Sequence, residues 1–302
     1  MKSIKNYLKY LLSVVGVSPT TIMYRLLRFR GVLKYDSSTD TIIRNVLGHK
    51  MHLNIHDTGL SKQLALKGTR EEESVVFIKQ LITPDMIILD LGANIGFYVL
   101  IEAGILKKGN GRIIALEPLR DNIKLLRLNV KASKYEDRVK IIEGAVSDHS
   151  GNVELAVFDA FNSNFLVELA GDGFSGRTET VRAYTFQELL LKAGLKDEKL
   201  DMLRMDIEGA EYLFMDSMLE YIRPLESFLI FVELHPGPSN IERHKKLLRE
   251  LEILGFKCIG ATKEYSENGS IKRVPFIGAT IHDLYTNDIL LKPGGCEVFL
   301  KK

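Results

Sequence analysis

Residues 86–100, MIILDLGANIGFYVL, provide the strongest evidence for the fold of this chain. Its apolar run ends at Asp90, and Gly92, Asn94 and Gly96 follow before a helix-forming segment begins. This order predicts a strand, a tight turn and a helix, the local build of a nucleotide-binding crossover. Glycines let a ligand approach the backbone, and the first turn of a helix offers unpaired N–H groups. The stretch therefore predicts a nucleotide-type ligand at this turn.

A second acid supports a cofactor site. Glu117 closes the next apolar run, RIIALEP, and an acid about 20 residues beyond such a loop commonly binds ribose hydroxyls. In the dinucleotide fingerprint G-x-G-x-x-G the second glycine makes room for a pyrophosphate, but Asn94 stands at that position here. The loop thus disfavours a nicotinamide oxidoreductase and favours an adenosine-type cofactor without a pyrophosphate. A turn that only joins a strand to a helix is the alternative.

Apolar runs and amphipathic segments alternate beyond the loop. This alternation predicts a doubly wound, mostly parallel α/β sheet of about seven strands, Rossmann-like, with helices on both faces. We expect its strands at residues 86–91, 112–117, 138–145, 200–206, 227–234, 256–261 and 296–300. We expect helices between them at residues 95–106, 119–132, 210–222 and 239–254.

The middle of the chain departs from this rhythm. Two further strands are predicted at residues 152–158 and 178–185. A helix follows them, with Thr185 as its N-cap, Glu188 as the capping-box partner and Gly194 as its C-cap.

The residues ahead of the sheet form an extension in this interpretation. Alternating apolar and polar residues predict a β-hairpin at 41–56, and a helix at 70–82 leads into the sheet. We therefore expect an N-terminal extension of helices and hairpin, residues 1–69, and a main domain, residues 70–302. The first 30 residues combine lysines with apolar runs and predict two helices. Packing on the domain is favoured for these helices over peripheral contact with a membrane surface.

Composition sets limits on partners and compartment. The chain has 302 residues, of which 45% are hydrophobic and 26% charged, and its net charge is +2. Such a balance provides no strong nucleic-acid signature. Cys258 and Cys296 lie far apart, which is typical of thiols in a reducing compartment. We therefore expect a cytoplasmic protein, with a possible peripheral membrane contact through residues 1–30. The sequence does not indicate an oligomeric state.

Five separated motifs carry a resemblance to a known family. They are LDLGANIGFY, ALEP, EGAVSDHSGN (143–152), RMDIEGAE (204–211) and VELHP (232–236). In this order and spacing the chain resembles the FkbM-type family of S-adenosylmethionine (SAM)-dependent methyltransferases, over roughly residues 70–261. The resemblance implies a class I methyltransferase fold and SAM as the cofactor. It also implies methyl transfer to a hydroxyl of a sugar, glycan or related small molecule.

The resemblance also implies which residues bind the cofactor. Asp90, Gly92, Asn94 and Gly96 would line the methionine part of SAM, and Glu117 would take the ribose hydroxyls. Ala145 and Val146 would lie against the adenine. The remaining residues assigned to the cofactor site are Ala93, Phe97, Pro118, Asn122 and Asp206.

Acidic residues and a histidine follow the predicted strands 200–206 and 227–234. Because the carboxyl ends of parallel strands meet at one edge, these side chains should share a pocket. Catalytic roles are assigned to His235, Asp206 and Glu208, with His235 as the natural base because its intrinsic pKa allows a neutral, accepting imidazole near neutral pH. Two structural alternatives stay open. His235 could cap the strand end, and the two acids could cap the helix predicted from residue 210.

A divalent cation is another interpretation of the same residues. Asp206, Glu208, Glu233 and His235 could bind Mg²⁺ or Mn²⁺. Acids at strand ends are common without a metal, and the spacing is not dense, so the sequence alone assigns no metal ligand.

Two competing functions remain. An RNA methyltransferase acting on ribose 2′-hydroxyls is compatible with the motifs, although the basic residues of 243–249, His244 among them, are explained by a solvated helix face. A non-catalytic binding module with a SAM-type fold is disfavoured, because such a module would not need an intact glycine loop and Glu117.

Overall fold

A computed structural model describes residues 30–54, 56–57, 59–157, 165–167, 176–196, 198–235, 241–267, 270–286 and 294–302. The chain forms two compact units, Met1–Arg70 and Glu71–Lys302. The helices predicted in the first 30 residues lie outside the described residues, apart from Arg30. No helix within the described part of the chain has the length and apolar character needed to cross a membrane.

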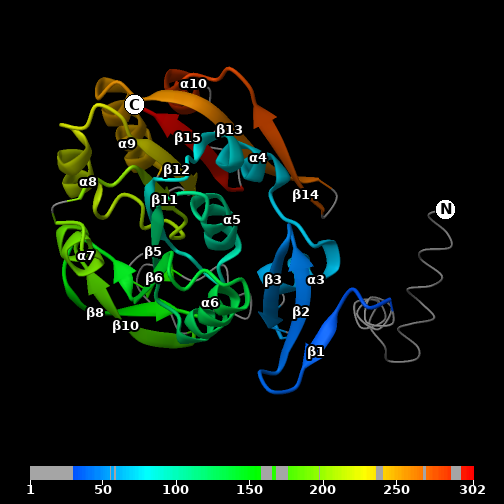
Figure 1. Cartoon of the computed structure of the whole chain (residues 1–302). Coiled ribbons are helices and arrows are strands. Elements are labelled where there is room, and N and C mark those ends of the chain that lie inside the picture. The colour runs from blue at the N-terminus through cyan, green and yellow to red at the C-terminus, as the bar shows by residue number, and fades with distance from the viewer. Residues whose placement is uncertain are drawn as a thin grey trace. The chain divides into compact units, whose positions relative to one another are not determined.

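The first unit contains the predicted hairpin and one additional strand (Figure 1). Its elements are β1 (Lys34–Asp36), β2 (Thr41–Val46), β3 (His49–Asn54) and α3 (Leu60–Lys67). β2 and β3 pair antiparallel across a two-residue turn. Leu47 and Gly48 form this turn with φ values of 50° and 95°, and positive φ at both central residues is the geometry that suits the twist of a hairpin. The hairpin prediction is therefore confirmed.

The second unit contains every other described element. Its helices are α4 (Glu72–Leu81), α5 (Phe97–Leu106), α6 (Arg120–Ala132), α7 (Phe186–Ala193), α8 (Met215–Ile222), α9 (Ile241–Ile253) and α10 (Ile281–Thr286). The strands of its main sheet are β4 (Ile87–Leu91), β5 (Arg112–Glu117), β6 (Val139–Glu143), β11 (Met202–Met205), β12 (Leu229–Leu234), β13 (Lys257–Glu267), β14 (Ser270–Phe276) and β15 (Cys296–Lys301). The other strands are β7 (Ala145–Val146), β8 (Gly151–Ala156), β9 (Phe165–Leu166) and β10 (Thr178–Tyr184).

The main sheet is doubly wound and mostly parallel, as predicted. Its strand order is β14-β13-β15-β12-β11-β4-β5-β6. Neighbouring strands from β12 to β6 run parallel, and β15 enters antiparallel between β12 and β13. The order along the chain reverses at β4 and β11, and open α/β sheets bind ligands beside the carboxyl ends of strands at such a point. The fold thus directs attention to the loops after β4 and β11.

The sheet has eight strands instead of about seven. The additional strand is β14, which pairs antiparallel with a β13 that continues six residues beyond the predicted end at residue 261. The strands predicted at 152–158 and 178–185 are confirmed as β8 and β10. They form a separate four-stranded sheet with β7 and β9.

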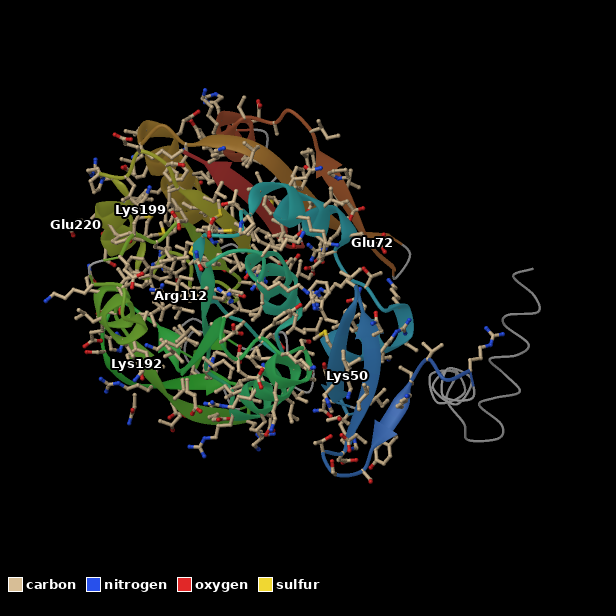
Figure 2. All side chains as sticks on the ribbon, viewed as in Figure 1. Lys50, Glu72, Arg112, Lys192, Lys199 and Glu220 are labelled. Carbon is tan, nitrogen blue, oxygen red and sulfur yellow. The ribbon has the colours of Figure 1, made fainter. Side chains whose placement is uncertain are left out.

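Helices cover the main sheet in two groups (Figure 1). α4 packs beside α5, whereas α8 contacts both α7 and α9, and α9 contacts α10. Buried residues of α7, α8 and α9 form one hydrophobic core with those of the central strands. Charged side chains such as Lys192 and Glu220 are exposed on the outside of this unit (Figure 2).

The ends of two helices test the capping predictions. Thr185 accepts a hydrogen bond from the Glu188 amide, Glu188 accepts one from the Thr185 amide, and Gly194 ends α7 in a left-handed conformation. The capping box is therefore confirmed. The helix predicted from residue 210 was placed too early, because α8 begins at Met215. Glu208 and Gly209, with φ values of 52° and 96°, lie ahead of the predicted helix, and residues 211–214 form turns before α8 begins.

Candidate active site

The glycine loop between β4 and α5 is tightly built. Gly92 has a φ of 84°, and a Cβ atom placed on it would lie 1.9 Å from the backbone oxygen of Asp206. Only glycine fits at this position, because both the space and the backbone conformation exclude a side chain. Asn94 also adopts a left-handed conformation, with a φ of 50°, and Gly96 is the N-cap of α5 with a φ of 92°. The predicted strand, turn and helix are thus confirmed.

Glu117 at the end of β5 holds this loop. Its Oε2 accepts a hydrogen bond from the Asn94 amide at 2.8 Å. Its Oε1 accepts hydrogen bonds from the Leu119 amide at 3.1 Å and from Nδ2 of Asn122 at 3.0 Å. The loop, the acid and Asn122, predicted separately as cofactor-site residues, therefore form one hydrogen-bonded unit.

The environment of Glu117 alters its acidity. Burial, together with the smaller effect of the charge of Asp90, raises the pKa of Glu117 to about 7, against the three hydrogen bonds that lower it. An ionised carboxylate offers about four acceptor positions, and protein donors occupy three of them. Glu117 can therefore accept one more hydrogen bond through Oε2.

Asp90 faces the protein interior. Its side chain is fully buried, and its Oδ1 lies 2.8 Å from Nη1 of Arg204. Arg204 also contacts Oδ2 of Asp206 at 3.0 Å, and its guanidinium lies 4.3 Å from the centre of the Tyr98 ring. A direct contact between Asp90 and the methionine part of SAM stays a prediction, since Asp90 pairs with Arg204 in this structure.

The other residues predicted to contact the cofactor follow the carboxyl ends of β4, β5 and β6 along the chain. Ala93 and Phe97 are buried at the loop and at the start of α5. Ala145 and Val146 form β7 and are also buried, directly after Gly144, whose amide donates to the backbone oxygen of Glu117 at 3.0 Å. Pro118 is half-buried and lines a cavity of about 630 Å³ along β6 and β10 that includes neither the glycine loop nor Asp206.

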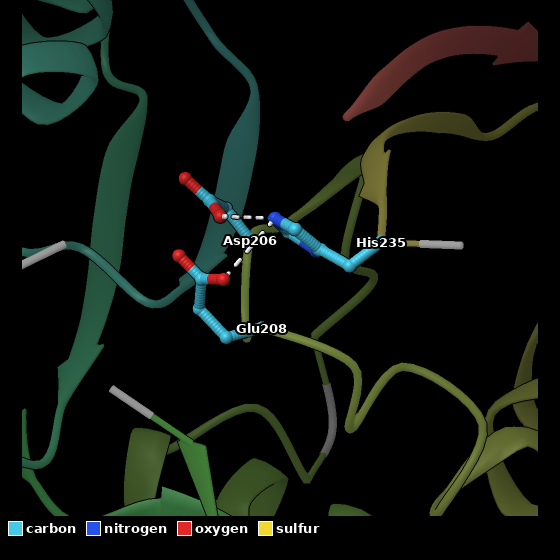
Figure 3. Close-up of side chains that lie close together, drawn as sticks. All are labelled: Asp206, Glu208 and His235. Atoms are coloured by element: carbon cyan, nitrogen blue, oxygen red, sulfur yellow. Dashed lines mark ion pairs between the residues drawn. The ribbon is translucent and has the colours of Figure 1, made fainter. Parts of the chain in front are cut away.

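A second cluster lies after β11 and β12, which run parallel as neighbours. Nε2 of His235 lies 3.8 Å from Oδ1 of Asp206 and 3.5 Å from Oε2 of Glu208 (Figure 3). Each of the three side chains keeps between a fifth and about a quarter of its surface exposed. The three residues predicted to be catalytic are thus brought together by the structure.

Glu211 fixes the imidazole of His235. Its Oε1 lies 3.0 Å from Nδ1 of His235, and its Oε2 lies 3.5 Å from Nε2 of His244. Glu211 is fully buried, and despite that burial its two histidine partners hold its pKa far below the usual range. His244 is fully buried as well, so its placement on a solvated basic helix face was wrong.

The carboxylates around His235 dominate its electrostatics. Burial alone would lower the pKa of His235, but the nearby carboxylates, led by Glu208, raise it well above its usual range. A neutral, proton-accepting imidazole near neutral pH does not fit this environment. The alternative in which Asp206 and Glu208 cap the next helix does not fit either, because α8 begins only at Met215.

Two arginines complete the surroundings and had no part in the sequence prediction. Arg273 of β14 contacts carboxylates of four other segments: Glu71, Glu233, Glu264 and Glu297. Arg204 lies directly opposite Asp90 in the pairing of β11 with β4. A charged residue within a buried apolar strand is the one local signal for Arg204, because buried charges are usually paired.

Comparison with solved structures finds similar folds at low identity. A transferase of Pyrococcus horikoshii is 14% identical over 86% of this chain and 71% of its own, with a TM-score of 0.47. TYW2 of the same organism, in complex with MeSAdo, is 15% identical over 94% of this chain and 86% of its own, with a TM-score of 0.47. An FkbM methyltransferase of Methylobacillus flagellatus is 14% identical over 71% of this chain and 52% of its own, with a TM-score of 0.45. No curated protein sequence matches the chain.

The strand order, the antiparallel β15 and the glycine loop joined to Glu117 define a class I SAM-dependent methyltransferase. The methyltransferase FkbM domain matches residues 90–258, more than half of the chain. The chain belongs to the FkbM methyltransferase family, and the predictions of family and cofactor are confirmed.

Proposed function

We propose that this protein methylates a hydroxyl oxygen of a sugar, a glycan or a related small molecule. Family membership supports methyl transfer. The observation that carries the proposal is the contact between the two clusters, since the Asp206 backbone oxygen lies directly beneath Gly92 and Asp206 leads into the Asp206–Glu208–His235 cluster. A residue that activates an acceptor thereby adjoins the cofactor loop.

The residues of the first cluster fit a SAM molecule. Among the described residues three donors contact the Glu117 carboxylate, which leaves one acceptor position for a ribose hydroxyl. Ala145 and Val146 would supply apolar side chains for the adenine ring, and Asn122 would hold Glu117 for the ribose through its hydrogen bond. When bound, SAM supplies a methyl group on a positively charged sulfur.

The second cluster fits an oxygen acceptor. A neutral hydroxyl is a weak nucleophile, so its attack becomes easier when polar groups orient the oxygen and assist loss of its proton. Asp206, Glu208 and His235 converge at a partly exposed position and can contact such a hydroxyl. These three side chains would therefore select and activate the acceptor, while the glycine loop and Glu117 hold the cofactor.

Calorimetric titration with SAM tests the cofactor half of the proposal. We expect the unchanged protein to bind SAM and Glu117→Ala to lose at least about tenfold in affinity, because one truncation removes both a ribose acceptor and the support of the loop. Glu143→Ala is the matched control. Glu143 pairs with Glu117 across β5 and β6, but its side chain is exposed. Equal losses in the two variants would contradict the assigned role of Glu117.

Methyl transfer to an oxygen is tested with a panel of acceptors. The protein is incubated with SAM and with sugars, glycans, phenols or RNA, and S-adenosylhomocysteine and the methylated product are identified by mass spectrometry. We expect a methyl ether on a sugar or small molecule. Methylation of RNA alone would replace the proposed substrate class, and tight SAM binding with no turnover on any acceptor would favour a binding module.

His235→Ala separates catalysis from cofactor binding. We expect turnover to fall by about 10²-fold, because the imidazole orients the acceptor oxygen and the carboxylates that assist loss of its proton, while the affinity for SAM stays close to that of the unchanged protein. Unchanged turnover in this variant would remove His235 from the reaction.

We further propose a cytoplasmic location. Cys258 and Cys296 are both free thiols, which supports a reducing compartment. Peripheral membrane contact through residues 1–30 stays a prediction.

A further inference from the structure

Three side chains after β11 and β12 place one ligand atom each around a common point. The carboxylate oxygens of Asp206 and Glu208 and a ring nitrogen of His235 all lie within 4.8 Å of one another. Ligand atoms about 2.1 Å from an octahedral ion lie about 3 Å apart when adjacent and about 4.2 Å apart when opposite. Both separations of Nε2 of His235 from the carboxylate oxygens, 3.5 Å and 3.8 Å, exceed the adjacent distance, by about 0.5 Å and about 0.8 Å. The side chains would therefore have to close by less than about 1 Å to coordinate a divalent cation.

The contact of His235 with Glu211 is the arrangement typical of a metal-ligating histidine. Nδ1 of His235 lies 3.0 Å from the fully buried carboxylate of Glu211. When Nδ1 donates to this carboxylate, Nε2 can coordinate a cation that displaces its proton, and such a carboxylate–histidine pair commonly orients metal ligands. Glu211 lies outside the trio, so its contact is an independent observation in favour of coordination through Nε2.

Charge distinguishes this trio from a second group of three carboxylates. Glu71, Glu233 and Glu297 also place oxygens within 4.8 Å of one another, but the Arg273 guanidinium contacts all three and supplies their positive charge. In the first trio Arg204 contacts Oδ2 of Asp206, whereas Oδ1 of the same carboxylate faces His235. The pairing with Arg204 thus leaves Oδ1 of Asp206 directed toward His235, where a cation would lie.

We propose that Asp206, Glu208 and His235 bind a divalent cation, Mg²⁺ or Mn²⁺, with Glu211 as the positioning residue of the imidazole. Two carboxylates and one imidazole suit these oxygen-preferring ions. Three protein ligands leave coordination positions open on the exposed side of the cluster. If the proposed function holds, an acceptor with neighbouring hydroxyls would occupy them, and the cation would lower the pKa of a bound hydroxyl.

Titration of the metal-free protein with Mn²⁺, followed by electron paramagnetic resonance, tests the site without any turnover. We expect one bound Mn²⁺ per chain, with spin-echo modulation from an imidazole nitrogen. Glu208→Gln should abolish Mn²⁺ binding. His235→Ala should weaken Mn²⁺ binding, and any Mn²⁺ that it still binds should show no nitrogen modulation. Glu211→Gln keeps all three ligands but should weaken Mn²⁺ binding by about 10–100-fold. Glu143→Gln, which changes an exposed carboxylate on β6, should bind Mn²⁺ as the unchanged protein does.

SAM calorimetry on the same samples keeps the outcomes apart. Each variant that still binds SAM is folded, so its loss of Mn²⁺ reports on the cation site. An unchanged protein that binds SAM, shows no bound Mn²⁺ and methylates its acceptor in EDTA overturns the cation site while the proposed function stands. Bound Mn²⁺ with an imidazole signal, but no SAM binding, would support the cation site and contradict the proposed function. Equal Mn²⁺ affinity in Glu211→Gln would remove the positioning role of Glu211.

Discussion

Residue 92 leaves room for a hydrogen atom and for no side chain. The β4–α5 turn bends so sharply that a Cβ atom there would meet the Asp206 backbone at 1.9 Å. Backbone atoms of a central strand cannot move aside as the end of a flexible side chain can. The first glycine of the loop is thus required by packing between β4 and β11, in addition to any contact with a ligand.

Alanine substitution separates this clash from simple backbone strain. Gly194 has a φ of 82°, close to the 84° of Gly92, but nothing lies within 4 Å of a Cβ placed there. We expect Gly194→Ala to cost about 1–2 kcal/mol in the free energy of unfolding, the usual penalty of a left-handed residue with a side chain. Gly92→Ala should cost clearly more and should also weaken SAM binding. Urea unfolding and SAM calorimetry measure both effects, and equal costs at the two positions would be inconsistent with the clash.

The pKa of Glu117 predicts that cofactor affinity depends on pH. Only the ionised carboxylate is a full acceptor for a ribose hydroxyl, and the folded-state pKa of Glu117 is raised to about 7 by burial and by the charge of Asp90. SAM affinity should therefore be highest above about pH 8 and fall below about pH 7, by at most tenfold per pH unit. SAM binding should also release protons near neutral pH, which calorimetry in buffers of different ionisation enthalpy detects.

Glu117→Gln is the control for this pH dependence. It should bind SAM more weakly than the unchanged protein at high pH, with an affinity that no longer changes between about pH 6 and about pH 8. A variant that kept the original pH profile would show that another group titrates.

Sequence was informative at the residue scale where a motif is local. The glycine turn, Glu117 and Asn122 were predicted because their spacing is short and their backbone requirements are specific. Arg204 was missed because its partner Asp90 lies 114 residues away. His244 was misplaced because neighbouring charged residues hid a buried contact with Glu211. The pairing register of β4 with β11 is what brings Arg204 to Asp90.

At the scale of the elements, one ion pair connects two central strands. The pairing of β11 with β4 sets Arg204 directly opposite Asp90, and both side chains are almost fully buried. Breaking a buried ion pair by removing one partner leaves an uncompensated charge, which typically costs about 3–5 kcal/mol. Replacing both partners with neutral residues avoids that penalty.

We therefore expect Arg204→Met to be strongly destabilising, by about 3–5 kcal/mol. The double variant Asp90→Asn with Arg204→Met should recover most of this loss, because no buried charge at Asp90 remains to be compensated. Urea unfolding of the two single variants and the double variant gives the coupling free energy. Additive effects would mean that the pair contributes little beyond the packing of each side chain.

The predicted elements failed where a local signal was overlooked or misjudged. The two residues between β13 and β14 in the sequence are Asn-Gly (268–269), which is a strong hairpin signal, so β14 was predictable. The early start assigned to α8 has another origin. Hydrophobic periodicity suggested helix from residue 210, but the left-handed Glu208 and Gly209 and the turns after them delay it to Met215. That delay gives Glu208 and Glu211 the positions from which both contact His235.

At the scale of the whole molecule, the core and the site belong to one unit. The main sheet, the second sheet and their helices all lie in residues 71–302, and so do the glycine loop, Glu117 and the His235 cluster. Two hydrophobic cores that the described residues form, one with the main sheet and one with the second sheet, consist of residues of this unit. The first unit contributes three described strands, one described helix and a small set of buried apolar residues, Leu53 and Leu64 among them.

Because the second unit contains the large core and the whole candidate site, we expect it to fold and bind SAM without the first unit. A shortened chain should begin near Gly68, because Glu71 pairs with Arg273 and with Tyr98 and must be kept. About 230 residues with a continuous core exceed what independent folding requires, whereas about 40 residues rarely fold without a metal or disulfides. We expect the shortened chain to unfold cooperatively in urea and to bind SAM with the affinity of the full chain. The peptide of residues 30–70 should show no cooperative transition. A shortened chain that aggregates or unfolds without cooperativity, beside a full chain that unfolds in one transition, would show that the first unit is part of the fold of the catalytic domain.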